Sequence, residues 1–178
     1  MHWEVECKIA LRAPQVQSLK IKIGESYPKA IHKKLNIRDT YWGKGGTVPL
    51  FRVRNDSESL LITIKKKSKG ADAVEVNQEC EFSLAVQQAA KVVLFFKELG
   101  YTMLYEKEKI GEAWILGNQR IEIVEVPPLG HFLEIELIVG ENEHTAAYKQ
   151  LAEIRATLGV LHYPLEERFY SEMLFNKR

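Results

Sequence analysis

The chain has only two cysteines and no long apolar run. Two cysteines are too few for a disulfide framework, so Cys7 and Cys80 are expected to be reduced and buried on apolar strand faces. The segment VVLFF at 92–96 is flanked by lysines and falls far short of the roughly 18 apolar residues of a membrane span. The opening MHWEVECKIAL lacks the features of a signal peptide. We therefore expect a cytoplasmic protein with no membrane partner.

The sequence also lacks an excess of charge of either sign. Its 25 basic and 24 acidic residues leave a net charge of +1. No global field therefore favours nucleic acid, and any anion binding must come from a local arrangement of charges. The five histidines are scattered without the spacing of a zinc site, and each is expected to be structural or exposed rather than a ligand.

Short alternating segments separated by turn signals predict a mostly antiparallel β protein. The expected strands are 4–11, 47–54, 59–67, 73–82, 102–110, 112–117, 119–126 and 131–139. Helices are expected at 14–24, 84–100, 144–159 and 166–175, with Ser83 as the N-cap of the second. The predicted fold class is α+β, with an antiparallel sheet and helices packed on its outside, in one domain over residues 1–178.

Seven of the strands place charged side chains on one face, because side chains alternate across a strand. In EVECK, for example, Glu4, Glu6 and Lys8 share a face. The corresponding faces of the other strands hold Arg52, Arg54, Lys65, Glu79, Glu81, Lys107, Lys109, Arg120, Glu122, Glu134 and Glu136. Such a set forms either a broad solvated sheet face or the charged lumen of a barrel. Because desolvating each charge costs several kcal/mol, a lumen needs a matching polyanion and divalent cation.

The segments that carry these residues resemble, in order, those of the CYTH superfamily, which includes class IV adenylyl cyclases and thiamine triphosphatases. EVECK is similar to its Glu-x-Glu-x-Lys motif, DTYW to its Asp-x-Tyr segment, and LFRVR to its Leu-Arg-x-Arg strand. ITIK, ECE and EKEK are similar to its lysine strand, its Glu-x-Glu segment and its Lys-x-Arg pair. LGHFLEIE and RFYSEML resemble its Leu-Gly-x-Phe-x-Glu-Ile-Glu strand and C-terminal Arg-x-Tyr helix. Together the eight segments span nearly the whole chain.

The resemblance implies an eight-stranded antiparallel barrel whose tunnel binds a triphosphate with Mg²⁺ or Mn²⁺. The implied metal ligands are Glu4, Glu6, Glu134 and Glu136. The implied phosphate-binding residues are Lys8, Arg52, Arg54, Lys65, Lys107, Lys109 and Arg120. Lys8 and Glu6 are the implied catalytic residues, with Lys8 as a general base or water-positioning group. Supporting roles are expected for Glu79, Glu81, Glu122, Tyr41, Arg168 and Tyr170.

Three positions depart from the family pattern. Asn77 and Lys109 stand where many members have arginine, and Lys109 keeps the charge but loses bidentate geometry. Val124 stands where an aspartate is common. Glu122 shares the face of Val124 and is a candidate replacement for the missing acid.

The resemblance leaves three functions open. The first is a class IV adenylyl cyclase-like reaction from ATP to cyclic AMP and pyrophosphate, which the compact length and RFYSEML favour. The second is hydrolysis of inorganic triphosphate, thiamine triphosphate or a nucleoside triphosphate. The third is a non-catalytic polyphosphate or nucleotide binding module. The expected partner is a small-molecule triphosphate and no nucleic acid, and a homodimer is left open.

Overall fold

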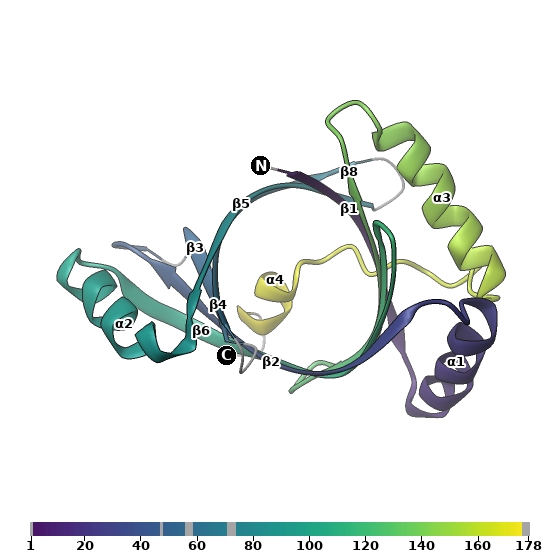
Figure 1. Cartoon of the computed structure of the whole chain (residues 1–178), viewed down its shortest axis with the longest axis horizontal. Coiled ribbons are helices and arrows are strands. Elements are labelled where there is room, and N and C mark those ends of the chain that lie inside the picture. Colours follow the sequence, from purple (N-terminus) through teal and green to yellow (C-terminus); the bar gives the residue numbers. More distant parts are fainter. Residues whose placement is uncertain (1, 47, 56–58, 71–73, 176–178) are drawn as a thin grey trace.

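The chain closes into a β-barrel, which the computed structural model describes over residues 2–46, 48–55, 59–70 and 74–175. The strands are β1 (His2–Leu11), β2 (Ile31–Gly43), β3 (Phe51–Asn55), β4 (Ser59–Lys69), β5 (Glu75–Ala85), β6 (Thr102–Leu116), β7 (Gln119–Val126) and β8 (Gly130–Val139). They pair antiparallel in the closed order β1-β5-β4-β3-β2-β6-β7-β8 (Figure 1). The predicted α+β class and eight-stranded antiparallel barrel are confirmed.

The strand count agrees with the prediction only because two errors offset each other. β2 is a strand that the sequence did not predict, since its first half is largely exposed and polar and shows little apolar alternation. Conversely, β6 is one continuous strand rather than two. Gly111 does not break it, because this glycine instead lets β7 approach: a Cβ there would collide with the backbone of Ile123 and Val124. The predicted strand starts at 47 and 73 lie outside the described residues.

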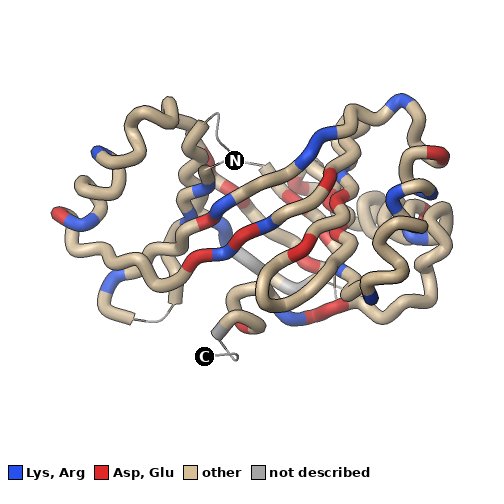
Figure 2. The backbone as a smooth tube through the Cα atoms, turned by 90° about the horizontal axis from the view of Figure 1, so that it is seen from below, with Lys and Arg blue, Asp and Glu red and all other residues tan. Residues whose placement is uncertain are grey.

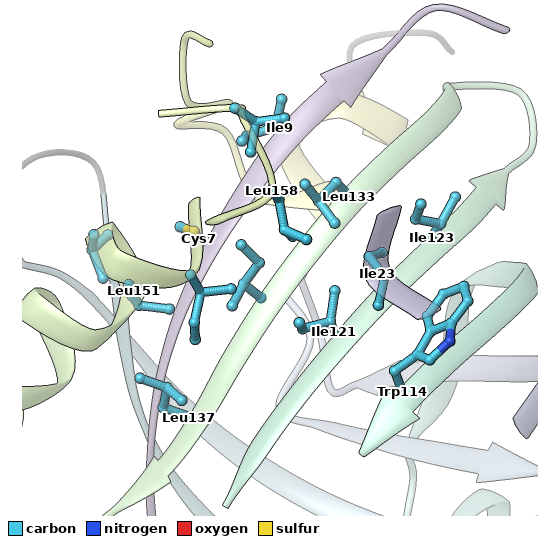
Figure 3. Close-up of a cluster of buried hydrophobic side chains, with 14 of the residues drawn as sticks. Cys7, Ile9, Ile23, Trp114, Ile121, Ile123, Leu133, Leu137, Leu151 and Leu158 are labelled. Atoms are coloured by element: carbon cyan, nitrogen blue, oxygen red, sulfur yellow. The ribbon is translucent and has the colours of Figure 1, made fainter. Parts of the chain in front are cut away.

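The largest core lies outside the barrel, between its wall and two helices. α1 (Ala13–Ser26) and α3 (His144–Thr157) cover the outer faces of β1, β7 and β8 (Figure 3). The fully buried side chains of this core include Val5, Ile9, Ile23, Ile121, Ile123, Leu133, Ile135, Leu137 and Leu151. Each contributes about 1.5–3 kcal/mol of hydrophobic stabilisation. Since these faces are anchored outward, the alternate residues of the same strands must point into the lumen.

A second, smaller core lies beneath α2 (Ala89–Glu98), which follows a 3₁₀ turn at Val86–Gln88. The helix begins later than predicted because β5 continues to Ala85, so Ser83 lies in a strand and caps no helix. The prediction of a buried Cys80 is wrong, since this thiol is exposed on β5 near the half-exposed Phe82. None of the described helices is both long and apolar enough to cross a membrane.

The last helix, α4 (Tyr170–Phe175), occupies a different place from the other three. The prediction of helices on the outside holds for α1, α2 and α3, but α4 lies within the outline of the ring (Figure 1). Its Met173 packs against Val124, Val126 and Phe132. Val124 shares a strand face with Glu122, so these apolar groups point inward at one end of the barrel. The helix therefore lies at one end of the barrel, against the inward-facing apolar residues of β7 and β8.

Candidate functional site

A cavity of about 690 Å³ lies inside the barrel and is lined by all eight strands and α4. Figure 2 shows acidic and basic positions interspersed along neighbouring strands. Among the predicted site residues, those that line the cavity are Glu4, Glu6, Tyr41, Arg52, Arg54, Lys65, Glu79, Glu81, Lys107, Lys109, Arg120, Glu122, Glu134, Glu136 and Tyr170. Of the two arrangements open from the sequence, the structure has the charged lumen and not the solvated sheet face.

A carboxylate cluster occupies the β1–β8 wall. Glu4, Glu6 and Glu136 each present an oxygen, and these oxygens lie within 4.8 Å of one another. Burial, together with the charges of Glu4 and Glu6, raises the pKa of Glu136 well above its usual range. The ionised form of Glu136 is therefore disfavoured by its burial and by its two acidic neighbours. Oxygen ligands at this spacing fit a hard divalent cation such as Mg²⁺ or Mn²⁺.

Lys65 reaches into this cluster from β4. Its ammonium lies 2.8 Å from Glu4 Oε2, 3.2 Å from Glu6 Oε2 and 3.0 Å from Glu79 Oε1. Burial alone would lower the pKa of Lys65, but the surrounding carboxylates raise it well above its usual range. A cation is therefore already the favoured occupant of the space between these carboxylates.

Cationic side chains gather across the lumen around Asp39, which the sequence reasoning missed. Asp39 is fully buried; its two oxygens accept hydrogen bonds from Arg54 Nε at 2.8 Å and Arg54 Nη2 at 3.1 Å, and Lys107 Nζ is 3.1 Å from Oδ2. Burial would raise the pKa of Asp39, but Arg54 and Lys107 hold it well below its usual range. The signal was present in DTYW, because Asp39 precedes Tyr41 at the spacing that puts both on one strand face.

A third cluster joins β6, β7 and β8. Lys109 Nζ donates to Glu122 Oε2 at 2.8 Å and to Glu134 Oε2 at 2.7 Å, and Arg120 Nε donates to the other oxygen of Glu122. Burial would raise the pKa of Glu122, but its two cationic partners lower it to about 2. Tyr170 donates its hydroxyl to Glu134 Oε1 at 2.6 Å. Both carboxylates are therefore engaged by donors and orient the cations beside them.

Two predicted site residues do not line the cavity. Lys8 is 3% exposed; its ammonium is 3.1 Å from Glu75 Oε1 and 4.6 Å from the centroid of the Tyr170 ring. Arg168 is an exposed residue that pairs with Glu166. Glu75 was missed by the sequence reasoning, although it lies two residues before Asn77 on the same face of β5.

The cavity also has an apolar part to its lining. It consists of Val48, Pro49, Leu50, Phe51, Leu61 and Ile138. The rings of Tyr41 and Tyr105, which line the cavity as well, stack with centroids 4.5 Å apart. An inorganic anion gains nothing from such groups, whereas the organic part of a ligand gains hydrophobic contact.

A closed eight-stranded barrel whose lumen interleaves carboxylates with ammonium and guanidinium groups is the triphosphate tunnel fold. The chain belongs to the CYTH domain family, whose sequence model matches residues 2–170. This family consists in general of divalent-metal-dependent cyclases and triphosphatases. The curated proteins include no significant match to the chain.

Solved structures show the same fold. The PH1819 protein of Pyrococcus horikoshii OT3 is 25% identical, with a TM-score of 0.75 over 98% of this chain and 99% of that one. A candidate adenylate cyclase of Vibrio parahaemolyticus is 17% identical, with a TM-score of 0.72 over 97% and 98%. A candidate adenylyl cyclase of Hippeastrum, described as having a dominant triphosphatase activity, is 15% identical, with a TM-score of 0.70 over 98% and 96%. At these identities the likeness concerns the fold.

Proposed function

We propose that the protein is a divalent-metal-dependent enzyme that acts on a nucleoside triphosphate, with conversion of ATP to cyclic AMP and pyrophosphate as the leading reaction. The observation that carries this proposal is the division of one lumen into three parts. Carboxylates gather on one wall, cations face them, and apolar and aromatic side chains complete the lining. These parts match the metal, the phosphates and the organic moiety of a metal-bound nucleotide.

The Glu4, Glu6 and Glu136 oxygens are the proposed metal ligands. A bound Mg²⁺ or Mn²⁺ would offset phosphate charge and make the attacking hydroxyl more acidic. Glu134 was expected among the ligands, but Lys109 and Tyr170 already engage its two oxygens. We therefore assign Glu134 to the orientation of Lys109.

The cations of the lumen are proposed to bind the phosphates. Arg54 is held by Asp39 through two hydrogen bonds, and Lys109 is held by Glu122 and Glu134. Because these partners fix the donors before a ligand arrives, little reorganisation is needed as charge develops on the leaving pyrophosphate. Arg52, Lys107 and Arg120 complete the set around the lumen.

The volume and lining of the cavity favour a nucleotide over inorganic triphosphate. A cavity of about 690 Å³ lies within the usual range for small-molecule sites, roughly 300–1,000 Å³. The stacked Tyr41 and Tyr105 rings and the apolar lining residues provide contact area for a base or ribose. Lys8, beneath the Tyr170 ring, is proposed to position that ring rather than to touch the substrate.

Product analysis tests the proposal. The protein is incubated with ATP and Mg²⁺ or Mn²⁺, and the products are separated by chromatography. Cyclic AMP and pyrophosphate in equal amounts are expected. Orthophosphate from ATP, inorganic triphosphate or thiamine triphosphate would instead identify a hydrolase, and no turnover of any of them would identify a binding module. Glu6→Gln should abolish turnover, whereas Glu106→Gln, on the outer face of β6, should not.

A further inference from the structure

Four polar side chains form a square on the inner face of β1 and β5. The strand register pairs His2 with Glu79 and Glu4 with Asn77. Because the two pairs are separated by two residues on each strand, all four side chains point to the same face. Side chains in such neighbouring cross-strand pairs are close enough to share a ligand.

Three atoms of this square that can bind a metal ion lie close to one another. His2 Nε2 lies 3.6 Å from Glu4 Oε1 and 3.8 Å from Glu79 Oε2, and all three atoms lie within 4.8 Å of one another. Both distances from the imidazole are too long for a hydrogen bond. They suit two ligands of a common ion, because atoms about 2.1 Å from one metal lie roughly 3.4–3.8 Å apart at tetrahedral to wider angles. Lys65 contacts the other oxygen of each carboxylate.

Asn77 is the second, independent observation. Its side chain is fully buried, and neither its nitrogen nor its oxygen has a hydrogen-bond partner among the described residues. Leaving a polar group buried and unpaired costs about 1–3 kcal/mol, so such a group in a native structure points to an unseen water or ion. The register places it directly across from Glu4 and one position along its strand face from Glu79. Its amide oxygen is thus available to a cation in the square.

We propose that His2, Glu4 and Glu79, with Asn77 as a fourth ligand, form a site for a transition-metal cation at the end of the tunnel opposite α4. Imidazole nitrogen suits Zn²⁺, Co²⁺ and Mn²⁺ better than Mg²⁺, which prefers oxygen ligands alone. His2 also lines the cavity and is partly exposed, so an ion can reach the site from solvent. The site is separate from the Glu4, Glu6 and Glu136 cluster but shares Glu4 with it. Binding at the two sites is therefore coupled reciprocally.

Titration of the untagged, metal-free protein with Co²⁺ tests the proposal, because cobalt absorption bands report the ligand type without any need for turnover. The wild-type chain should bind one Co²⁺ at this site, with the spectrum of a mixed nitrogen and oxygen site. His2→Gln should weaken that site by at least about 10-fold, the scale seen when groups around a metal are altered. The matched control is His162→Gln, which changes an exposed histidine elsewhere and should leave the spectrum unchanged.

Three further variants separate this site from the carboxylate cluster. Glu136→Gln should weaken Mg²⁺ binding measured by calorimetry but keep the cobalt spectrum, and Glu4→Gln should weaken both. Asn77→Leu should weaken Co²⁺ binding while the metal-free fold, followed by thermal unfolding, stays intact. Equal Co²⁺ affinity and spectra in the wild type and His2→Gln would overturn the proposal, as would loss of the cobalt spectrum in Glu136→Gln. Because the readout is binding, the site stands or falls separately from the reaction proposed above.

Discussion

Replacement of Asp39 by asparagine is expected to destabilise the barrel more than any other single conservative change in the lumen. The carboxylate is fully buried and bridges Arg54 of β3 to Lys107 of β6 through three contacts of 2.8–3.1 Å. Asparagine keeps the shape but removes the negative charge. Two cations are then left facing each other with no anion between them.

The magnitude follows from burial. Breaking a buried ion pair by removing one partner costs about 3–5 kcal/mol. In a domain of this size, 1 kcal/mol shifts the melting temperature by about 2–4 °C, so a decrease of roughly 6–20 °C is expected. The matched control is Glu106→Gln on the same strands. It removes an exposed ion pair with Arg38 and should cost about 1 kcal/mol or less.

Thermal unfolding at several pH values, with and without inorganic triphosphate, measures both parts of this prediction. Because the folded-state pKa of Asp39 lies well below its usual range, its stabilisation is present above the unfolded pKa near 4. This stabilisation is lost only as the pH falls from the unfolded-state pKa toward the folded-state pKa. The difference in melting temperature between the wild type and Asp39→Asn should therefore persist at pH 4. Triphosphate should stabilise Asp39→Asn more than the wild type, because the polyanion supplies the missing charge. Equal melting temperatures for Asp39→Asn and Glu106→Gln at pH 7 would refute this reasoning.

Three other predictions concern single residues. A thiol reagent should label one cysteine per native chain, the exposed Cys80. Cys7 should react only after unfolding, because it is buried and that burial raises its pKa to about 12. Two labelled thiols in the native state would contradict the structure. Asn77→Leu should raise the melting temperature of the metal-free protein, because it removes an unpaired buried amide worth about 1–3 kcal/mol; a decrease measured by calorimetry would show that the amide has a partner. In denaturant unfolding at pH 7, Glu122→Gln should lower the free energy of unfolding far more than Glu125→Gln. The difference in free energy between the two variants should narrow between about pH 4.5 and 2, because the wild-type Glu122 carboxylate, with its pKa of about 2, becomes protonated there. Equal effects of the two glutamate changes would mean that Lys109 and Arg120 do not depend on Glu122.

Strand periodicity was enough to predict which residues share a strand face, because each alternating segment fixes its own two faces. The prediction that these faces enclose a lumen came from the resemblance to the CYTH superfamily. Glu6, Arg54, Lys65 and Glu136 all line the cavity. The same reasoning failed for β2, since its mostly exposed first half carries no strong alternation. The alternation of apolar residues within one strand does not determine which side chains of the adjacent strands contact it.

Contacts between segments that are distant in the chain could not be predicted from the sequence. Lys8 is screened from the cavity by Tyr170, which a chain return of about 160 residues brings onto it. His2 meets Glu79 only because β1 pairs with β5 in one particular register. A shift of one residue would have turned His2 away from this partner's face, and neither strand's sequence alone specifies the register. Histidine spacing along the chain therefore gave no hint of this cluster.

The position of α4 gives the two ends of the tunnel different surroundings. At one end Met173 packs against Val124, Val126 and Phe132, and at the other end His2 and Ile138 line the cavity. A ligand whose own two ends differ therefore meets different neighbours in its two possible orientations, so the tunnel should bind it in one direction in preference to the other.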